Sequence, residues 1–407
     1  MDLQPRIDGM PVEVIEEIIS QLALPDICSL RLTGRKVNAK SSQGIFKSYF
    51  RNKTITMAAT SEQLHQAVHV TQRQGFGCLL ERLTLVGLAR PYNREESSKE
   101  CDMLLLFWQF MKDLGLNVAG GCLQSMSLTF KDGEDSSWES VWMTAAKCFK
   151  HTMLALHGNQ LPIKSLDVFI GVTRCSLSID QLATILELNL SASLQRLKCL
   201  SMSLSHHVAD GPEGEEMRAL ATGERHTNAL CKFLQYCPVL EDLQLHWYNL
   251  RVSNLTDALT EEQRFFDRVA QSCQFPFLKR FTLKGIRTSD AALLSFLRQV
   301  QLNSIEMEEI HLHTGKFHPV FDYLVKHMEK LEYVHLDNLW ENQLIYFDAP
   351  GEPHFDISGP PMGPNVLTRS GADARMPIKY QHSSGYPSGT MEATNWRRKR
   401  QRQYGPR

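Results

Sequence analysis

A pattern of apolar residues, L-x-x-L-x-L, recurs between residues 80 and 339 and constrains the fold more than any other feature of the chain. Its last two apolar residues flank one outward position, which is the period of a short strand with one buried face. Clear copies are Leu80-Leu83-Leu85-Leu88, Leu240-Leu243-Leu245, Leu278-Phe281-Leu283-Ile286 and Leu331-Val334-Leu336-Leu339. Weaker copies are Leu123-Met126-Leu128, Ile163-Leu166-Val168, Leu197-Leu200-Met202 and Met307-Ile310-Leu312. Between them the apolar spacing predicts helices over 101–114, 140–156, 179–188, 263–273 and 291–300.

A strand, a turn and a helix in repetition are typical of a leucine-rich-repeat solenoid, and we predict this α/β architecture, with irregular repeats, for residues 56–347. The copies begin 24 to 43 residues apart, whereas regular leucine-rich repeats have about 20–29 residues. Polar insertions would explain the long intervals, and so would strands that have lost their leucines. The alternative is a non-repeating α/β domain whose parallel strands are rich in leucine.

The N-terminal segment has a different pattern, that of two short helices, each opened by a proline. Pro11 suits the first turn of a helix because its missing N–H would have no partner there. Apolar residues then recur at helical spacing, and Pro25-Asp26 opens the second helix with an acidic residue near its positive end. Two helices of this length cannot bury both apolar faces by themselves, so this segment needs a further helix or a partner.

The order of residues in this segment resembles the F-box. The matching features are Met10-Pro-Val-Glu13, the apolar ladder through Leu22, and Asp26-Ile27-x-x-Leu30-Arg31-Leu32. The following stretch, 34–51, is similar to the ending common in fungal members of that family. Met10 stands where leucine is usual, and no tryptophan closes the motif.

This resemblance implies a function in protein degradation. Residues 1–55 would bind the adaptor subunit of an SCF (adaptor–cullin–F-box) ubiquitin ligase complex and, through it, the cullin. The repeat domain would hold a protein substrate by protein–protein interaction, so the chain would be a substrate adaptor and not itself an enzyme. The adaptor-binding residues expected from this resemblance are Pro11, Ile15, Ile18, Leu22, Ile27 and Leu30. The alternative is a non-catalytic leucine-rich-repeat scaffold with a degenerate F-box that does not direct ubiquitylation.

The outward positions of the last four strand copies predict where a substrate binds. In register, one column would hold Gln244, Thr282, His311 and His335, and the next would hold His246, Lys284, His313 and Asp337. With Arg280 and Tyr333 beside them, these residues favour an acidic or phosphorylated segment. We therefore expect substrate binding by His246, Arg280, Lys284, His311, His313, Tyr333 and His335. Histidine protonation would strengthen this binding as pH falls from about 7.5 to 6.

Composition excludes several other classes of function. A net charge of −1 provides no global attraction to nucleic acid or membrane, and no apolar run approaches the roughly 20 residues of a membrane span. The ten cysteines are scattered without a C-x-x-C pair, which suits reduced thiols in a cytoplasmic or nuclear protein. We find no phosphate-binding loop, nucleophile elbow or zinc motif. The sequence thus predicts no cofactor, no metal site and no catalytic residue.

Residues 348–407 differ in composition from the rest of the chain. Eight prolines and seven glycines lie among residues 350–407, and no apolar period is visible. Such a composition predicts a disordered tail. The tail ends in the basic cluster Arg397-Arg-Lys-Arg-Gln-Arg402, which is typical of a nuclear localisation signal, of a polyanion-binding patch or of an ordinary solvated tail.

Overall fold

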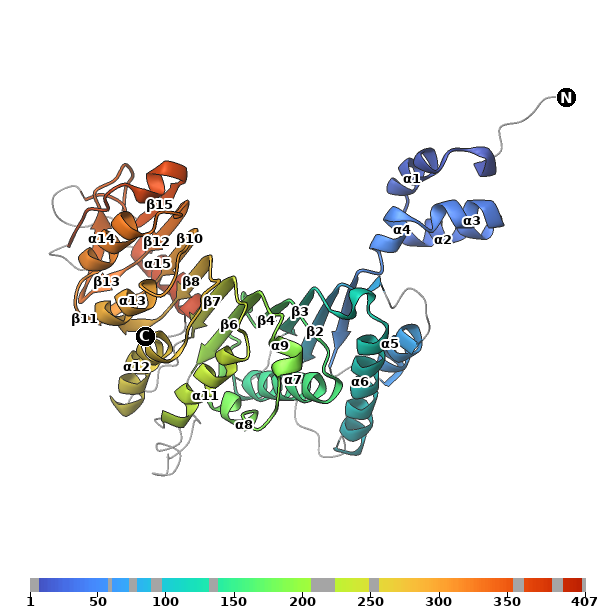
Figure 1. Ribbon diagram of the computed structural model, residues 1–407, viewed down its shortest axis with the longest axis horizontal. Helices are drawn as coiled ribbons and strands as arrows, with labels where there is room; N and C mark the ends of the chain where they lie inside the picture. The colour runs from blue at the N-terminus through green and yellow to red at the C-terminus, as the bar shows by residue number, and fades with distance from the viewer. Residues whose placement is uncertain are drawn as a thin grey trace.

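The fold comes from a computed structural model, which describes residues 7–57, 61–72, 79–88, 97–131, 138–205, 224–248, 256–353, 362–382 and 391–404. Short N-terminal helices stand beyond one end of a long sheet (Figure 1). They are the 3-10 helix η1 (Ile7–Gly9), α1 (Val12–Ser20), α2 (Leu24–Leu32), α3 (Arg35–Ser41) and α4 (Gly44–Ser48). Pro11 directly precedes α1, and Pro25 lies in the first turn of α2, so both prolines have the helix-opening positions that the sequence predicts.

The body of the chain is built on an eleven-stranded sheet. Its strands are β1 (Asn52–Thr56), β2 (Arg82–Leu88), β3 (Ser125–Lys131), β4 (Ser165–Val168), β5 (Leu177–Ser178), β6 (Cys199–Ser205), β7 (Asp242–Trp247), β8 (Arg280–Lys284), β10 (Ser304–Glu308), β12 (Tyr333–Asp337) and β15 (Val366–Ser370). The order is β1-β2-β3-β4-β6-β7-β8-β10-β12-β15, with β5 beside β6. All neighbouring pairs are parallel except β12 and β15, which are antiparallel.

A second, five-stranded sheet accompanies the C-terminal part of the first. Its strands are β9 (Arg287–Ser289), β11 (His311–Thr314), β13 (Trp340–Glu341), β14 (Gln343–Phe347) and β16 (Tyr380–His382), in the order β16-β14-β13-β11-β9. Each of β9, β11 and β13 follows a strand of the large sheet after a short turn. The chain therefore passes from one sheet to the other several times in this region.

Helices lie along one side of the large sheet, where α6, α7, α11 and α12 are seen together (Figure 1). The elements that connect the strands are α5 (Ser61–Gln72), α6 (Ser97–Asn117), η4 (Ala119–Gly121), α7 (Trp138–Asn159), α8 (Asp180–Thr184), α9 (Ser191–Leu194), α11 (Glu224–Gln235), α12 (Thr256–Ser272), α13 (Asp290–Leu297) and α14 (Phe317–His327). The chain ends with η5 (Gly371–Arg375) and α15 (Met391–Tyr404). One continuous apolar core extends from Ile55 to Ile378.

The prediction of a leucine-rich-repeat solenoid is wrong. The strands form a large, mostly parallel α/β sheet that ends in an antiparallel strand and is joined by a second sheet. The connecting helices α6 and α7 have 21 and 22 residues, which is about the length of a whole leucine-rich repeat. The leucine pattern recurs because each strand buries one face under helices, and an ordinary α/β sheet has the same requirement. The structure fits the alternative of a non-repeating α/β domain with leucine-rich strands.

The prediction of a disordered tail is also wrong for the described part of residues 348–407. Strand β15 pairs with the whole length of β12, and Leu367, Ala374 and Ile378 belong to the main core. Helix α15 ends at Tyr404, whose side chain is only 3% exposed. These few apolar residues are far apart in the sequence, so their common core shows no period there.

Strand β1 begins at Asn52 and pairs with β2, so the large sheet includes the last residues of the segment 1–55 that the sequence assigns to the F-box. Within the described residues, no helix has both the length and the apolar character needed to cross a membrane.

Candidate functional site

The N-terminal helices have a small core of their own, separate from that of the sheet. Ile15 and Ile19 of α1, Ile27 of α2 and Phe46 of α4 are buried together. The Arg31 guanidinium lies 3.8 Å from the centre of the Phe46 ring, where a cation adds to the packing by attraction to the aromatic face. Helices α3 and α4 thus provide the additional packing that two short helices lack.

Polar contacts fix the chain around this core. The Glu16 carboxylate accepts a hydrogen bond from the Ile45 backbone N–H at 3.1 Å, and the Lys40 ammonium donates to the carbonyl oxygen of Met10 at 2.5 Å. The Tyr49 hydroxyl donates to the carbonyl oxygen of Leu22. These contacts join residues about 30 positions apart in the sequence, so the helices form one packed unit, which we call the N-terminal helical module (residues 7–50).

The six residues predicted to bind an adaptor are divided between the interior and the surface of this module. Ile15 and Ile27 are 1% and 0% exposed, so they hold the helices together and are not available to a partner. Pro11 is exposed, and the remaining three are partly exposed: Ile18, Leu22 and Leu30.

Sequence reasoning assigned no binding role to the exposed apolar residues of the helical module, of which Val14 and Leu32 are the most exposed. Val14 is 44% exposed and Leu32 is 88% exposed. The signal that would have indicated them is an apolar side chain that stays exposed when the module is folded. That signal requires knowledge of which face packs inward, and helical spacing alone does not provide it.

The outward columns of the sheet differ from the prediction at β10. Gln244, Thr282, Glu306 and His335 are neighbours in one column, and His246, Lys284, Glu308 and Asp337 are neighbours in the next. Glu306 and Glu308 thus occupy the places that the sequence pattern gives to His311 and His313. The true copy of the pattern on this strand is Leu302-x-x-Ile305-x-Met307. This shift of register replaces two titratable bases by two carboxylates.

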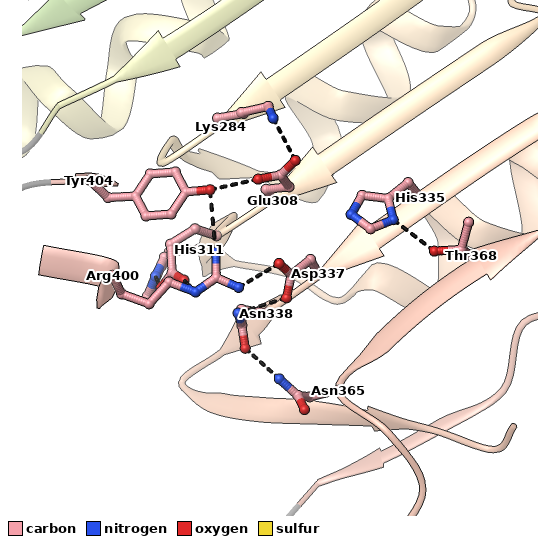
Figure 2. A network of polar contacts seen from close by, with 11 residues as sticks. Lys284, Glu308, His311, His335, Asp337, Asn338, Asn365, Thr368, Arg400 and Tyr404 are labelled. Atoms are coloured by element: carbon pink, nitrogen blue, oxygen red, sulfur yellow. Dashed lines mark hydrogen bonds and ion pairs between the residues drawn. The ribbon is translucent and has the colours of Figure 1, made fainter. Parts of the chain in front are cut away.

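A network of ion pairs and hydrogen bonds occupies this face of the sheet (Figure 2). The Lys284 ammonium lies 2.5 Å from one Glu308 carboxylate oxygen, and the Tyr404 hydroxyl donates to the other at 2.7 Å. Burial alone would raise the pKa of Glu308, but the hydrogen bonds from Lys284 and Tyr404 outweigh it and hold that pKa below its usual value. Glu308 is therefore an ionised carboxylate with its partners in place.

Helix α15 supplies the other cation of this network. Arg400 forms an ion pair with Asp337 and lies 3.7 Å from the Glu309 carboxylate. Burial and the nearby Glu308 carboxylate raise the pKa of the Tyr404 hydroxyl, which keeps it a proton donor. Trp396 packs against the apolar cluster of Leu344 and Tyr346. Since residues 396, 400 and 404 recur every four positions, one face of α15 rests on the sheet.

His246 is enclosed at the end of this network. Its Nδ1 atom lies 3.1 Å from the Ser203 hydroxyl, and its ring meets the ring of Tyr404 edge to face at 5.5 Å. Burial lowers the pKa of His246 to about 4, although a hydrogen bond with the Gln403 backbone raises it slightly. His246 is therefore neutral at pH 6, and its predicted role as a cation between pH 7.5 and 6 is wrong.

The other predicted substrate-binding residues lie in separate places. His311 and His313 belong to β11 of the second sheet, where His311 stacks on Trp340 and His313 lies 3.9 Å from Asp267. Arg280 forms an ion pair with Asp242 at 2.8 Å at the start of β8.

His335 and Tyr333 are on β12. His335 Nδ1 lies 2.8 Å from the Thr368 hydroxyl of β15, and Tyr333 is partly exposed. The structure thus gathers His246, Lys284 and His335 near one another and places His311, His313 and Arg280 elsewhere. Because Tyr404 of α15 contacts His246 and the Glu308 partner of Lys284, these two predicted residues belong to an internal contact of the chain, whereas His335 is partly exposed.

The enclosed state of His246 predicts a loss of stability in acid. Its pKa is about 4 in the folded chain and about 6.5 when unfolded, so only the unfolded chain binds the proton between these values. The stability contribution is complete above pH 6.5, decreases by up to about 1.4 kcal/mol per pH unit as pH falls from 6.5 to 4, and is fully lost below pH 4. Urea unfolding at pH 7.0 and 4.5 should show a smaller loss for His246→Gln than for the unmodified chain. Equal losses would contradict the prediction. The carboxylates contribute equally to the acid loss of the variant and of the unmodified chain, so only His246 should make the two losses differ.

No grouping of three or more histidine, cysteine, aspartate or glutamate side chains suited to a metal ion is present in the described part of the chain. Comparison with protein-family models and with curated proteins finds no match to this sequence.

Proposed function

We propose that this chain is the substrate-recognition subunit of an SCF-type ubiquitin ligase. In this proposal the N-terminal helical module binds the adaptor, and the α/β sheet domain holds a protein substrate. Ubiquitin transfer would be carried out by other subunits, and this chain would contribute proximity. Its localisation would be cytoplasmic, nuclear or both.

The observation that carries the proposal is the separate packing of the N-terminal helices. They have their own core, yet Val14 and Leu32 remain exposed on α1 and α2. Exposed apolar side chains on the two helices that carry the F-box-like motif are what a docking module requires. The helical module has a core separate from that of the sheet domain, so each part has its own surface for a partner.

The test is a pulldown of the adaptor and cullin, read by mass spectrometry, with the full chain and with a chain lacking residues 1–50. This deletion removes the helical module and retains β1, which begins at Asn52 and belongs to the sheet. We expect the full chain to recover both ligase subunits and the shortened chain to recover neither. Recovery of sheet-bound partners without adaptor by both chains would contradict the proposal and favour a scaffold that does not direct ubiquitylation.

A further inference from the structure

A row of residues joined by backbone hydrogen bonds crosses the N-terminal ends of the parallel strands, on a different surface from the network around α15. The backbone N–H of Lys198 donates to the carbonyl oxygen of Lys164, that of Glu241 to Lys198, and that of Lys279 to Glu241, at 2.7–2.8 Å. Asn303 continues the row with a bond to the Lys279 carbonyl oxygen. Equivalent positions immediately before β4, β6, β7, β8 and β10 are thus neighbours across the sheet edge.

An open groove of about 680 Å³ lies along this row. Its charged lining is made of Lys164, Arg196, Lys198, Lys279 and Lys330 with the single carboxylate Glu241. The groove therefore carries five cations against one anion, although the whole chain has a net charge of −1. Its positive charge is a local property of this edge.

Glu241 is shared between two of these cations. Its carboxylate oxygens lie 2.6 Å from the Lys198 ammonium and 2.7 Å from the Lys279 ammonium. The hydrogen bonds from Lys198 and Lys279 lower the pKa of Glu241 to about 2. It therefore stays ionised and fixes two lysines, while the positive charge of the groove remains in excess.

Arg196 and Lys330 are the cations of the groove that remain available. Both side chains are exposed, and neither forms an ion pair with a carboxylate of the described residues. Lys164 donates to the Gln124 side-chain oxygen at 3.1 Å, which is a neutral partner. An anion in the groove could therefore pair with Arg196, Lys330 or Lys164 without displacing a carboxylate from them.

The groove also has an exposed aromatic residue. Phe277 lies between α12 and β8 and is 56% exposed, although its neighbours Phe275 and Leu278 are buried. Since large exposed aromatic side chains are common anchor points in binding surfaces, Phe277 adds an apolar contact among the cations.

We propose that this groove binds an acidic peptide segment of a partner protein, with an apolar residue of that segment packed on Phe277. Its cations are distributed over strand ends about 4.8 Å apart and do not converge on one point. This distribution suits several carboxylates along an extended chain better than a single phosphate group. Glu241 within the groove opposes the continuous phosphate backbone of a nucleic acid. The proposal is independent of adaptor docking, because it concerns the sheet domain alone.

The test measures fluorescence anisotropy of labelled twelve-residue peptides with the full chain. The first peptide alternates glutamate and glycine around a central Leu-Phe pair, and its control has glutamine for every glutamate. We expect binding of the glutamate peptide that weakens at least tenfold between 50 and 300 mM salt, and at least tenfold weaker binding of the glutamine peptide. Equal binding of the two peptides would overturn the proposal.

Two variants separate the groove from general charge effects. Arg196→Glu with Lys330→Glu should weaken binding of the glutamate peptide at least tenfold. Lys36→Glu with Lys379→Glu makes the same change in net charge at exposed positions outside the groove lining, and it should change binding less than twofold. Equal effects of the two pairs would overturn the assignment of the groove. Stronger binding of an otherwise neutral peptide with one phosphoserine would overturn the choice of an acidic peptide.

Discussion

Deletion of residues 350–407 is expected to lower the melting temperature of the sheet domain by roughly 10 °C, although their composition suggests a dispensable tail. This deletion removes β15, the edge strand paired with all five residues of β12, together with Leu367 and Ile378 of the core. It also removes Tyr404, which is buried on the sheet face. Burial of a large apolar side chain contributes about 1.5–3 kcal/mol. We therefore expect the deletion to lower the free energy of unfolding of the sheet domain by about 5 kcal/mol.

Smaller changes should divide this loss into parts. Arg400→Ala removes the cation that contacts Asp337 and the buried Glu309, so we expect a loss of about 1–3 kcal/mol, limited by the free energy that holds α15 on the sheet. Lys379→Ala, at an exposed position of the same segment, should change stability by less than about 0.5 kcal/mol. Calorimetry of the full and shortened chains provides the measurement. A melting temperature within two degrees of the full chain's would show that the contacts of residues 350–407 contribute nothing to the fold.

The strands could be predicted from sequence because the residues that each strand buries are indicated by the sequence of that strand alone. Alternation of buried and outward residues in β2 and β7 follows from the pleat of a strand that packs one face on helices. The same alternation does not say whether the connections have equal lengths. The strands of a solenoid and of an open α/β sheet therefore have similar sequence patterns. The long helices α6 and α7 distinguish the two folds.

The C-terminal segment could not be predicted because its contacts are distant in sequence. Leu367 meets the core through pairing with β12, and Tyr404 donates to Glu308, a residue 96 positions earlier. Neither residue belongs to an apolar period. Without the partner strand in view, a sparse set of apolar residues among prolines and glycines has the composition of a disordered chain.

The error in the predicted binding face has a specific cause at β10. The leucine pattern is also matched by Met307, Ile310 and Leu312, but these residues span the turn between β10 and β11. The correct copy, which begins at Leu302, is equally apolar. Its glutamates at 306 and 308 would have indicated an ion-pair network with Lys284 and not a cationic surface. A shift of a few residues thus reversed the charge of the predicted site.

The proposed adaptor contact gives the largest expected effect of a point substitution. Leu32→Asp or Val14→Asp should weaken adaptor binding at least a hundredfold, because an unpaired carboxylate in an apolar interface costs several kcal/mol. Both residues are exposed in the unbound chain, so neither substitution should change the stability of the helical module by more than about 0.5 kcal/mol. Surface plasmon resonance with purified adaptor measures the affinity, and thermal melting checks the fold.

Two control variants separate the loss of a contact with the adaptor from unfolding of the helical module. Ile19→Asp places a charge in the core of the helical module, where the side chain is 0% exposed, and it should abolish binding by unfolding that module. Arg35→Ala changes an exposed residue of α3 and should leave binding within twofold. If Leu32→Asp and Val14→Asp bind the adaptor as well as Arg35→Ala does, these helices do not dock through their exposed apolar residues. Loss of binding with unchanged melting would instead place the adaptor on α1 and α2, because only contact with a partner can make these exposed positions costly to charge.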